Sequence, residues 1–155
     1  MPGLEDLYRE IILDHYRTPR NRGELPVPPA RHAEGHNPLC GDEITIFLDV
    51  ETENGDEIVN DVKVSGQGCS ISQSSASMMS AAVKGQSVTD VRALVRKFKG
   101  MMSIETEGDE SDGEHIALGD LEALQGVVKF PVRIKCATLA WNTLLQALEA
   151  PASDS

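Results

Sequence analysis

Residues 43–69 read EITIFLDVETENGDEIVNDVKVSGQGC. Over residues 44–50 an apolar side chain stands at every second position, with Thr45, Phe47 and Asp49 between them, which is typical of a strand with one buried face. The segment at 53–56, Glu-Asn-Gly-Asp, is typical of a tight turn between two antiparallel strands. The alternation then resumes with Ile58, Val62 and Val64. This stretch therefore predicts a β-hairpin, whose second strand is broken by glycines just before Cys69.

Helical periodicity appears on both sides of the hairpin, with apolar residues repeating every three or four positions. The predicted helices cover residues 4–18, 72–84, 89–100 with Thr89 as its cap, 118–127, and a final segment after Pro131. The proline-rich segment 19–38 is expected to be extended, with room for one short strand. Together these elements predict an α+β fold, with a small three-stranded antiparallel sheet and helices packed on one face.

The composition limits the chain to one domain. With 155 residues, of which 40% are hydrophobic, it can build one well-buried core but not two ordinary ones. We expect a single domain over residues 1–150 and a frayed tail over 151–155. Residues 105–115 are strongly acidic and contain neither lysine nor arginine. They predict a mobile acidic loop at about 103–117.

The charge and the apolar runs exclude several functional classes. No apolar run approaches the roughly 20 residues that cross a bilayer, and the start lacks the basic-then-apolar order of a secretory signal. We therefore expect a soluble, cytoplasmic protein without a membrane partner. The formal net charge is −11 and the isoelectric point about 4.7, so the chain would repel nucleic acid as a general partner.

All three cysteines fall at the boundaries of predicted elements: Cys40, Cys69 and Cys136. Such boundaries can bring distant segments together at one rim of a fold. A thiol is often simply a small buried hydrophobic group, and for each cysteine taken alone this alternative stays open. Cys40 favours a ligand role, because Gly41 gives the backbone freedom and Asp42 can direct a carboxylate towards the same point.

The surroundings of the other two cysteines also suit a charged sulfur. Cys69 lies in a glycine-rich turn, where backbone amides can approach a thiolate or an ion. Cys136 is expected in the first turn of the final helix, where unpaired amides and the helix dipole favour a thiolate. Arg133 and Lys135 add positive charge, and with Lys129 they form a basic edge on an acidic protein.

Three thiolates and one carboxylate would supply four ligands to a divalent ion. Sulfur donors select zinc, copper(I) or iron–sulfur clusters over magnesium and calcium, and four ligands fit tetrahedral zinc. We therefore expect Cys40, Asp42, Cys69 and Cys136 to hold one metal, with zinc as the first choice and iron as the alternative. The basic edge can screen the excess negative charge. The hard oxygen of Asp42 is expected to be the most easily displaced ligand.

These residues belong to motifs that extend over nearly the whole chain. The motifs are Leu7-Tyr8-Arg9, Asp14-His15-Tyr16, Pro19-Arg20-Asn21, Asn37-Pro38-Leu39-Cys40-Gly41-Asp42, Gly66-Gln67-Gly68-Cys69-Ser70-Ile71-Ser72, Ala76-Ser77-Met78-Met79, Leu118-Gly119-Asp120, and Arg133-Ile134-Lys135-Cys136-Ala137-Thr138-Leu139 with Trp141. Together they resemble the iron–sulfur cluster assembly scaffold family (NifU N-terminal or IscU-like), and specifically its zinc-binding SufU-type branch. The general scaffold has histidine where Lys135 stands, and an inserted stretch around 101–118 lengthens the path to Cys136; both features favour that branch.

The resemblance implies a SufE/NifU-like scaffold fold in which the same four residues bind zinc. It also implies that Cys40 accepts persulfide sulfur from a SufS-type cysteine desulfurase, and that downstream cluster-assembly proteins use it. In this picture a desulfurase side chain replaces Cys40 on the zinc when the two proteins dock, so that the freed thiolate reacts at once. The docking surface is expected to be flanked by the basic edge and by Tyr16 and Arg20.

Zinc-dependent sulfur transfer is the leading hypothesis, and two other functions stay open. In one, the same ligands assemble a transient 2Fe–2S cluster and the protein delivers it to apoproteins as a scaffold. In the other, zinc is only a structural staple in an adaptor domain, and Cys40 does not react with persulfide.

Overall fold

The computed structural model describes residues 4–26, 30–38, 41–102, 121, 123, 124, 127 and 130–149. Its elements are α1 (Leu4–Arg17), β1 (Arg31–Asn37), β2 (Asp42–Glu53), β3 (Asp56–Gln67), α2 (Ser70–Val83), α3 (Val88–Met101) and α4 (Pro131–Glu149). The predicted acidic loop, the tail and most of the predicted helix at 118–127 lie outside the described residues. The α+β class is confirmed, with a three-stranded antiparallel sheet in the order β1-β2-β3.

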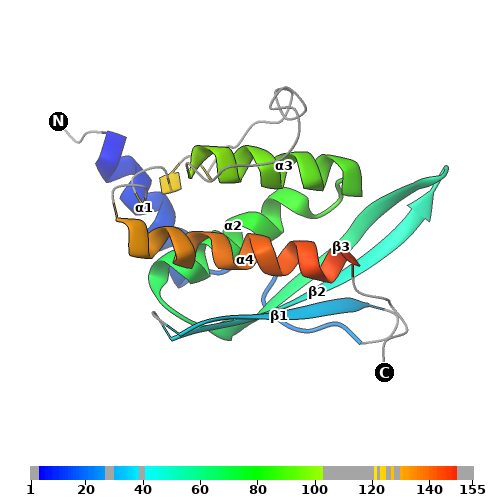
Figure 1. The fold of residues 1–155 in the computed structure, drawn as a ribbon, viewed down its shortest axis with the longest axis horizontal. Coiled ribbons are helices and arrows are strands. Elements are labelled where there is room, and N and C mark those ends of the chain that lie inside the picture. The colour runs from blue at the N-terminus through cyan, green and yellow to red at the C-terminus, as the bar shows by residue number, and fades with distance from the viewer. Residues whose placement is uncertain are drawn as a thin grey trace.

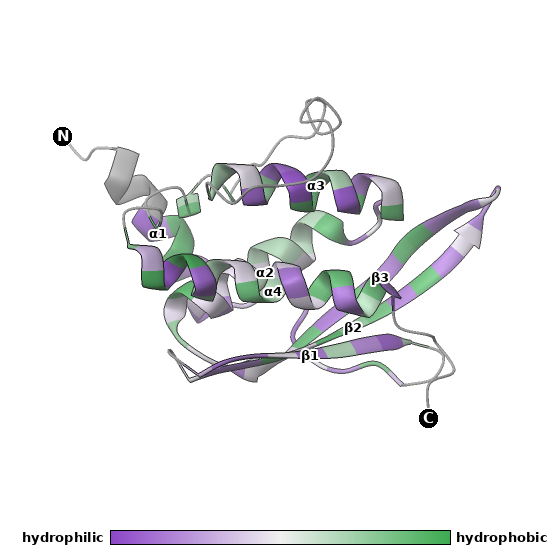
Figure 2. Cartoon of the chain, viewed as in Figure 1, coloured by the Kyte–Doolittle hydropathy of each residue, from purple (hydrophilic) through white to green (hydrophobic). Residues whose placement is uncertain are grey.

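The β2–β3 hairpin forms as predicted. Asn54 and Gly55 at its tip have positive φ angles of 52° and 86°, which is the backbone of a two-residue hairpin turn. In β2 the alternation places the inward-facing apolar side chains in the core: Ile44, Ile46 and Leu48. Figure 2 shows this alternation of hydrophobic and hydrophilic residues along both long strands.

The prediction for β3 is wrong at one position. The fully buried residue is Val59, whereas Ile58 is only partly buried. The pairing register shifts between Asp49 and Val50 of β2, since Asn60 is an extra residue in β3. Such a bulge changes which residues face the core on one side of it. A strict period of two cannot anticipate this shift.

The helices lie together on one side of the sheet (Figure 1). α4 packs across β1 and β2, while α2 and α3 contact β3, and α1 packs on α2. The predicted arrangement, with helices on one face, is confirmed. One hydrophobic core joins these elements. In the described part of the chain, no helix has the length and apolar character needed to span a membrane.

Trp141 of α4 contacts both α2 and α3 and so holds the three helices together. Its indole stacks on Phe98 of α3, with ring centroids 4.3 Å apart and an interplanar angle of 12°. Its Nε1 donates to Ser75 Oγ of α2 at 3.1 Å, and this hydroxyl donates to the carbonyl oxygen of Ala137 at 2.5 Å. Because these contacts are buried, they fix α4 against α2 immediately after Cys136.

The helices α3 and α4 both begin at residues that suit the amino end of a helix. α3 is capped by Ser87, whose side chain accepts from the Asp90 amide, so the expected cap at Thr89 is wrong by two positions. α4 begins at Pro131, which suits a first helical position because proline has no amide hydrogen to satisfy there. The carbonyl oxygen of Phe130 accepts the first helical hydrogen bonds.

β1 approaches α4 closely at Gly35. A Cβ atom at this position would collide with Thr143 Oγ1 of α4, and it would lie 3.1 Å from a Leu139 methyl and 3.2 Å from an Ile44 methyl. Only glycine leaves room for this contact. The distance between β1 and α4 therefore depends on one missing side chain.

We predict that Gly35→Ala destabilises the protein by about 1–3 kcal/mol, because the added methyl group overpacks the contact between β1 and α4. Gly100→Ala is the matched control: its added Cβ meets nothing within 4 Å, and alanine favours a helix by up to about 1 kcal/mol. Denaturant unfolding of both variants measures the difference. Equal midpoints for the two variants would contradict the close approach.

Candidate metal centre

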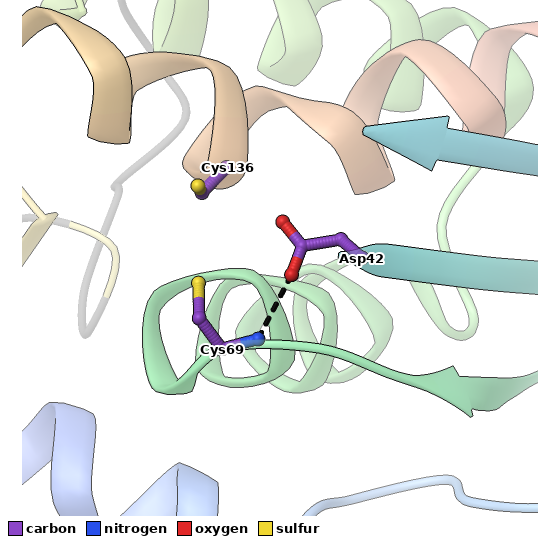
Figure 3. A group of neighbouring side chains, drawn as sticks. All are labelled: Asp42, Cys69 and Cys136. Atoms are coloured by element: carbon purple, nitrogen blue, oxygen red, sulfur yellow. Dashed lines mark hydrogen bonds between the residues drawn. The ribbon is translucent and has the colours of Figure 1, made fainter. Parts of the chain in front are cut away.

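Three of the four predicted ligands meet at one end of the sheet (Figure 3). Asp42 is the first residue of β2, Cys69 directly precedes α2, and Cys136 lies in α4. One ligand atom from each lies within 4.8 Å of the other two, and no second group of this kind occurs among the described residues. Cys40, the fourth predicted ligand, lies outside the described residues.

The two carboxylate oxygens of Asp42 have different environments. The side chain is 1% exposed, and its Oδ1 accepts a 2.8 Å hydrogen bond from the Cys69 amide. Its Oδ2 is buried and has no hydrogen-bond partner in the described part of the chain. Leaving a buried carboxylate oxygen unpaired is costly, so this oxygen fits a metal ligand. The anchored Oδ1 argues against the expectation that Asp42 is the most easily displaced ligand.

Two glycines let the segment before α2 approach the start of β2, and one of them makes room for this carboxylate. A Cβ atom at Gly68 would collide with Asp42 Oδ1 and with Ser72 Oγ. Gly66 has a φ of +117°, and a Cβ there would collide with the carbonyl oxygen of Glu43 in the neighbouring strand. The glycine-rich turn therefore serves first to admit Asp42 to the amide of Cys69.

Cys69 caps the amino end of α2. Its backbone is extended, with φ −71° and ψ 168°, and its Sγ accepts from the Ser72 amide at 3.4 Å. Its carbonyl oxygen accepts from the Gln73 amide at 3.0 Å. An amide at a helix amino end suits a negatively charged sulfur. The helix amino end expected to favour a thiolate at Cys136 therefore lies at Cys69.

Cys136 is the sixth residue of α4 and lies in its second turn, not in the first turn as predicted. The reason is that the helix already begins at Pro131. The side chain is fully buried; its Sγ donates to the carbonyl oxygen of Val132 at 3.8 Å and accepts from Asn37 Nδ2 at 3.7 Å. Asn37 did not emerge from the sequence as a functional residue, although it begins the motif that contains Cys40.

The basic edge lies beside Cys136 on the surface of α4. Arg133 and Lys135 are exposed, while Lys129 lies outside the described residues. Two apolar side chains accompany them: Phe130 is 61% exposed and Val132 is 56% exposed. No motif in the sequence marks these two residues as functional. We call the exposed set Phe130, Val132, Arg133 and Lys135 the α4 patch.

The two predicted flanking residues from the first segment differ from each other. Tyr16 is 45% exposed in the last turn of α1. Arg20 instead donates to Asp14 at 2.6 Å and to the carbonyl oxygen of Thr18 at 3.0 Å. Its guanidinium lowers the pKa of the Asp14 carboxyl through this hydrogen bond. Arg20 is therefore engaged within the chain.

The donor set fits zinc. Two sulfurs and one carboxylate oxygen are ligands that zinc accepts readily, and neither described cysteine is in a disulfide. Tetrahedral zinc, with bonds of about 2.0–2.3 Å, separates its ligand atoms by roughly 3.5 Å. The separation between the three ligand atoms would have to shrink by about an ångström for them to bind such an ion. They leave one tetrahedral position for a fourth ligand.

Comparisons with known proteins find a zinc-dependent protein among those to which this chain is similar. The chain is 48% identical over 142 residues to the zinc-dependent sulfurtransferase SufU of Bacillus subtilis (strain 168), covering 92% of this chain and 89% of that protein. It is 37% identical over 150 residues to the iron–sulfur cluster assembly scaffold protein IscU of Streptococcus pyogenes serotype M1, covering 97% and 87%.

A solved structure from Fervidobacterium islandicum AW-1, described as an iron–sulfur cluster assembly scaffold protein for the SUF system, has the same fold. It superposes with a TM-score of 0.75 at 32% identity, covering 95% of this chain and all of that one. The sequence pattern of the NifU-like N-terminal domain matches residues 7–137. Because this match spans most of the chain, the protein belongs to the NifU-like N-terminal domain family.

Proposed function

We propose that this protein is a zinc-dependent sulfur acceptor and carrier, which takes persulfide sulfur from a cysteine desulfurase for iron–sulfur cluster biogenesis. The observation that carries the proposal is the buried group of Asp42, Cys69 and Cys136 with one unpaired carboxylate oxygen. The similarity to a zinc-dependent sulfurtransferase supports it. A reducing compartment such as the cytoplasm suits this chemistry, because the thiols must stay reduced.

The four proposed ligands have unequal roles. Cys69 accepts a hydrogen bond from the Ser72 amide, and Cys136 accepts one from Asn37. Asp42 accepts a hydrogen bond from the Cys69 amide. Cys40 is two residues from Asp42 in the sequence, so we expect it to supply a ligand to the same ion. Bound zinc would keep the cysteines as thiolates and tie the three segments together. The resemblance to the zinc-binding branch of the family implies that Cys40 is the ligand that leaves and reacts.

The transfer step needs no outside oxidant or reductant. The Cys40 thiolate attacks the terminal sulfur of the desulfurase persulfide, and a new sulfur–sulfur bond forms on Cys40. The sulfur–sulfur bond in the desulfurase breaks, and its cysteine leaves as a thiolate. The proton on the terminal sulfur, where present, moves with that sulfur. Downstream cluster-assembly proteins would then receive the sulfur.

The α4 patch is the proposed docking surface for the desulfurase. It combines two exposed apolar side chains with two cationic ones, directly beside the buried Cys136. Exposed apolar residues of this kind are typical of interaction surfaces, and cations on an acidic protein select an acidic partner surface. Tyr16 is a further exposed residue for this role, while Arg20 is engaged with Asp14.

The second candidate function is assembly of a transient 2Fe–2S cluster. The similarity to an iron–sulfur cluster assembly scaffold protein favours it, and cysteine sulfurs can ligate iron as well as zinc. Anaerobic reconstitution with iron and sulfide separates the two functions. A stoichiometric chromophore that moves to an apoprotein supports the scaffold, while a colourless protein that retains zinc supports the sulfur carrier.

We predict that Cys40→Ala abolishes persulfide acceptance and desulfurase stimulation, because it removes the attacking sulfur. Mass spectrometry of the protein after incubation with desulfurase and cysteine detects the added sulfur atom. Zinc content and circular dichroism serve as controls for the fold. Full stimulation by this variant would overturn the proposed function.

A comparison of Asp42→Asn with Asp42→Ala tests the two carboxylate oxygens separately. Both variants should bind zinc at least tenfold more weakly, since they lose the charged ligand. Without metal, the Ala variant should be about 1–3 kcal/mol less stable than the Asn variant, because only asparagine can still accept from the Cys69 amide. Chelator competition and denaturant unfolding measure these effects. Equal stability of the two metal-free variants would argue against a stabilising hydrogen bond between the Cys69 amide and Asp42.

The docking surface predicts that Lys135→Gln raises the concentration needed for half-maximal desulfurase stimulation several-fold, with little change in the maximum. Gln146→Glu is the control: it changes the net charge by the same amount at an exposed position of α4, roughly 16 Å along the helix. An equal effect of both variants would show that total charge, not the α4 patch, determines docking.

A further inference from the structure

Asn37 of β1 contacts the sulfur of Cys136 in α4, the helix that packs on this strand. It is the last residue of β1, it is 6% exposed, and its Nδ2 donates to Cys136 Sγ at 3.7 Å. In the β1–β2 register it is paired with Asp42, so one strand pair supplies both the carboxylate and the amide to this site. The buried amide of Asn37 therefore donates directly to a sulfur that we propose as a metal ligand.

The fold places this amide through the close approach at Gly35. Gly35 and Asn37 are two residues apart in β1 and point to the same face of the strand. Thr143, which would collide with a Cβ at Gly35, lies two turns after Cys136 and on the same side of α4. The missing side chain at Gly35 therefore brings β1 near enough for Asn37 to reach the sulfur.

The amide gains importance once Cys136 loses its proton. As a thiol, Cys136 donates to the carbonyl oxygen of Val132. A thiolate cannot donate, whereas it accepts from Asn37 more strongly because the acceptor is charged. Cys69 Sγ similarly accepts from the Ser72 amide. Each described sulfur of the centre thus receives an N–H donor from the protein.

We propose that Asn37 is a positioning residue of the metal centre, whose amide holds Cys136 as a fixed ligand and lowers the electron-donating power of its sulfur. The fixed orientation keeps Cys136 on the metal, and the lowered donating power makes its sulfur compete less with Cys40 for a persulfide. The inference rests on the proposed metal binding but not on sulfur transfer. Hydrogen-bond donors to metal-ligating side chains orient these ligands and tune the metal centre.

Asn37→Leu tests the proposal, because leucine has a similar size but no donor. Cobalt(II) replaces zinc as the probe, since thiolate-to-cobalt charge transfer reports on the sulfur directly. Loss of the hydrogen bond should move this absorption to lower energy, and zinc affinity measured by chelator competition should fall about 10–100-fold. Asn60→Leu is the control: it removes an exposed amide that donates to Asp49 instead of a sulfur.

Asn37→Asp provides a second variant, in case leucine prevents folding. Aspartate keeps the size of the side chain and, when ionised, removes the donor, so it should also move the charge-transfer absorption to lower energy. An unchanged charge-transfer band and unchanged affinity in a folded Asn37 variant would overturn this inference alone. Failure of the wild-type protein to bind cobalt or zinc would overturn the proposed function as well.

Discussion

The hydrogen bond from the Cys69 amide to Asp42 Oδ1 is the contact on which the metal centre depends. It joins the first residue of β2 to the cap of α2, and it fixes one oxygen of a buried carboxylate while the other stays unpaired. Bulky side chains in the turn would exclude the carboxylate, and on the surface both of its oxygens would be solvated by water. Gly66 and Gly68 supply the space, and the buried charge supplies the need for a cation.

The third segment of the centre is positioned by core packing. Trp141 stacks on Phe98 and donates to Ser75, and Ser75 donates to the Ala137 carbonyl, one residue after Cys136. The position of the Cys136 sulfur is therefore set by the interface of α2, α3 and α4. A metal ion held by three such segments would stabilise the fold and respond to any movement between them.

The sequence predicts most of the fold because its signals are local. The hairpin turn at Asn54 and Gly55, and the helical periodicities, can be recognised in short windows. The bulge at Asn60 cannot, since it depends on the pairing of two strands. Likewise, Cys136 is in the second turn because the helix accepts Pro131 as its first residue.

The site is predictable in its residue types but not in its contacts. Cysteines at element boundaries and the Cys-Gly-Asp motif identify Asp42, Cys69 and Cys136 as candidate ligands. The different roles of the two Asp42 oxygens appear only when β2 meets the turn before α2. The contribution of Asn37 requires the approach of β1 to α4, which a missing side chain makes possible. Both are consequences of tertiary packing.

We propose that one zinc ion is held by three cysteines and one carboxylate. X-ray absorption at the zinc edge of the loaded protein tests it most directly, because sulfur and oxygen ligands differ in distance and scattering. We expect three sulfurs at about 2.3 Å from the zinc and one oxygen at about 2.0 Å, with one sulfur fewer in Cys40→Ala. A shell of nitrogen and oxygen ligands, or a sulfur count that Cys40→Ala leaves unchanged, would contradict it.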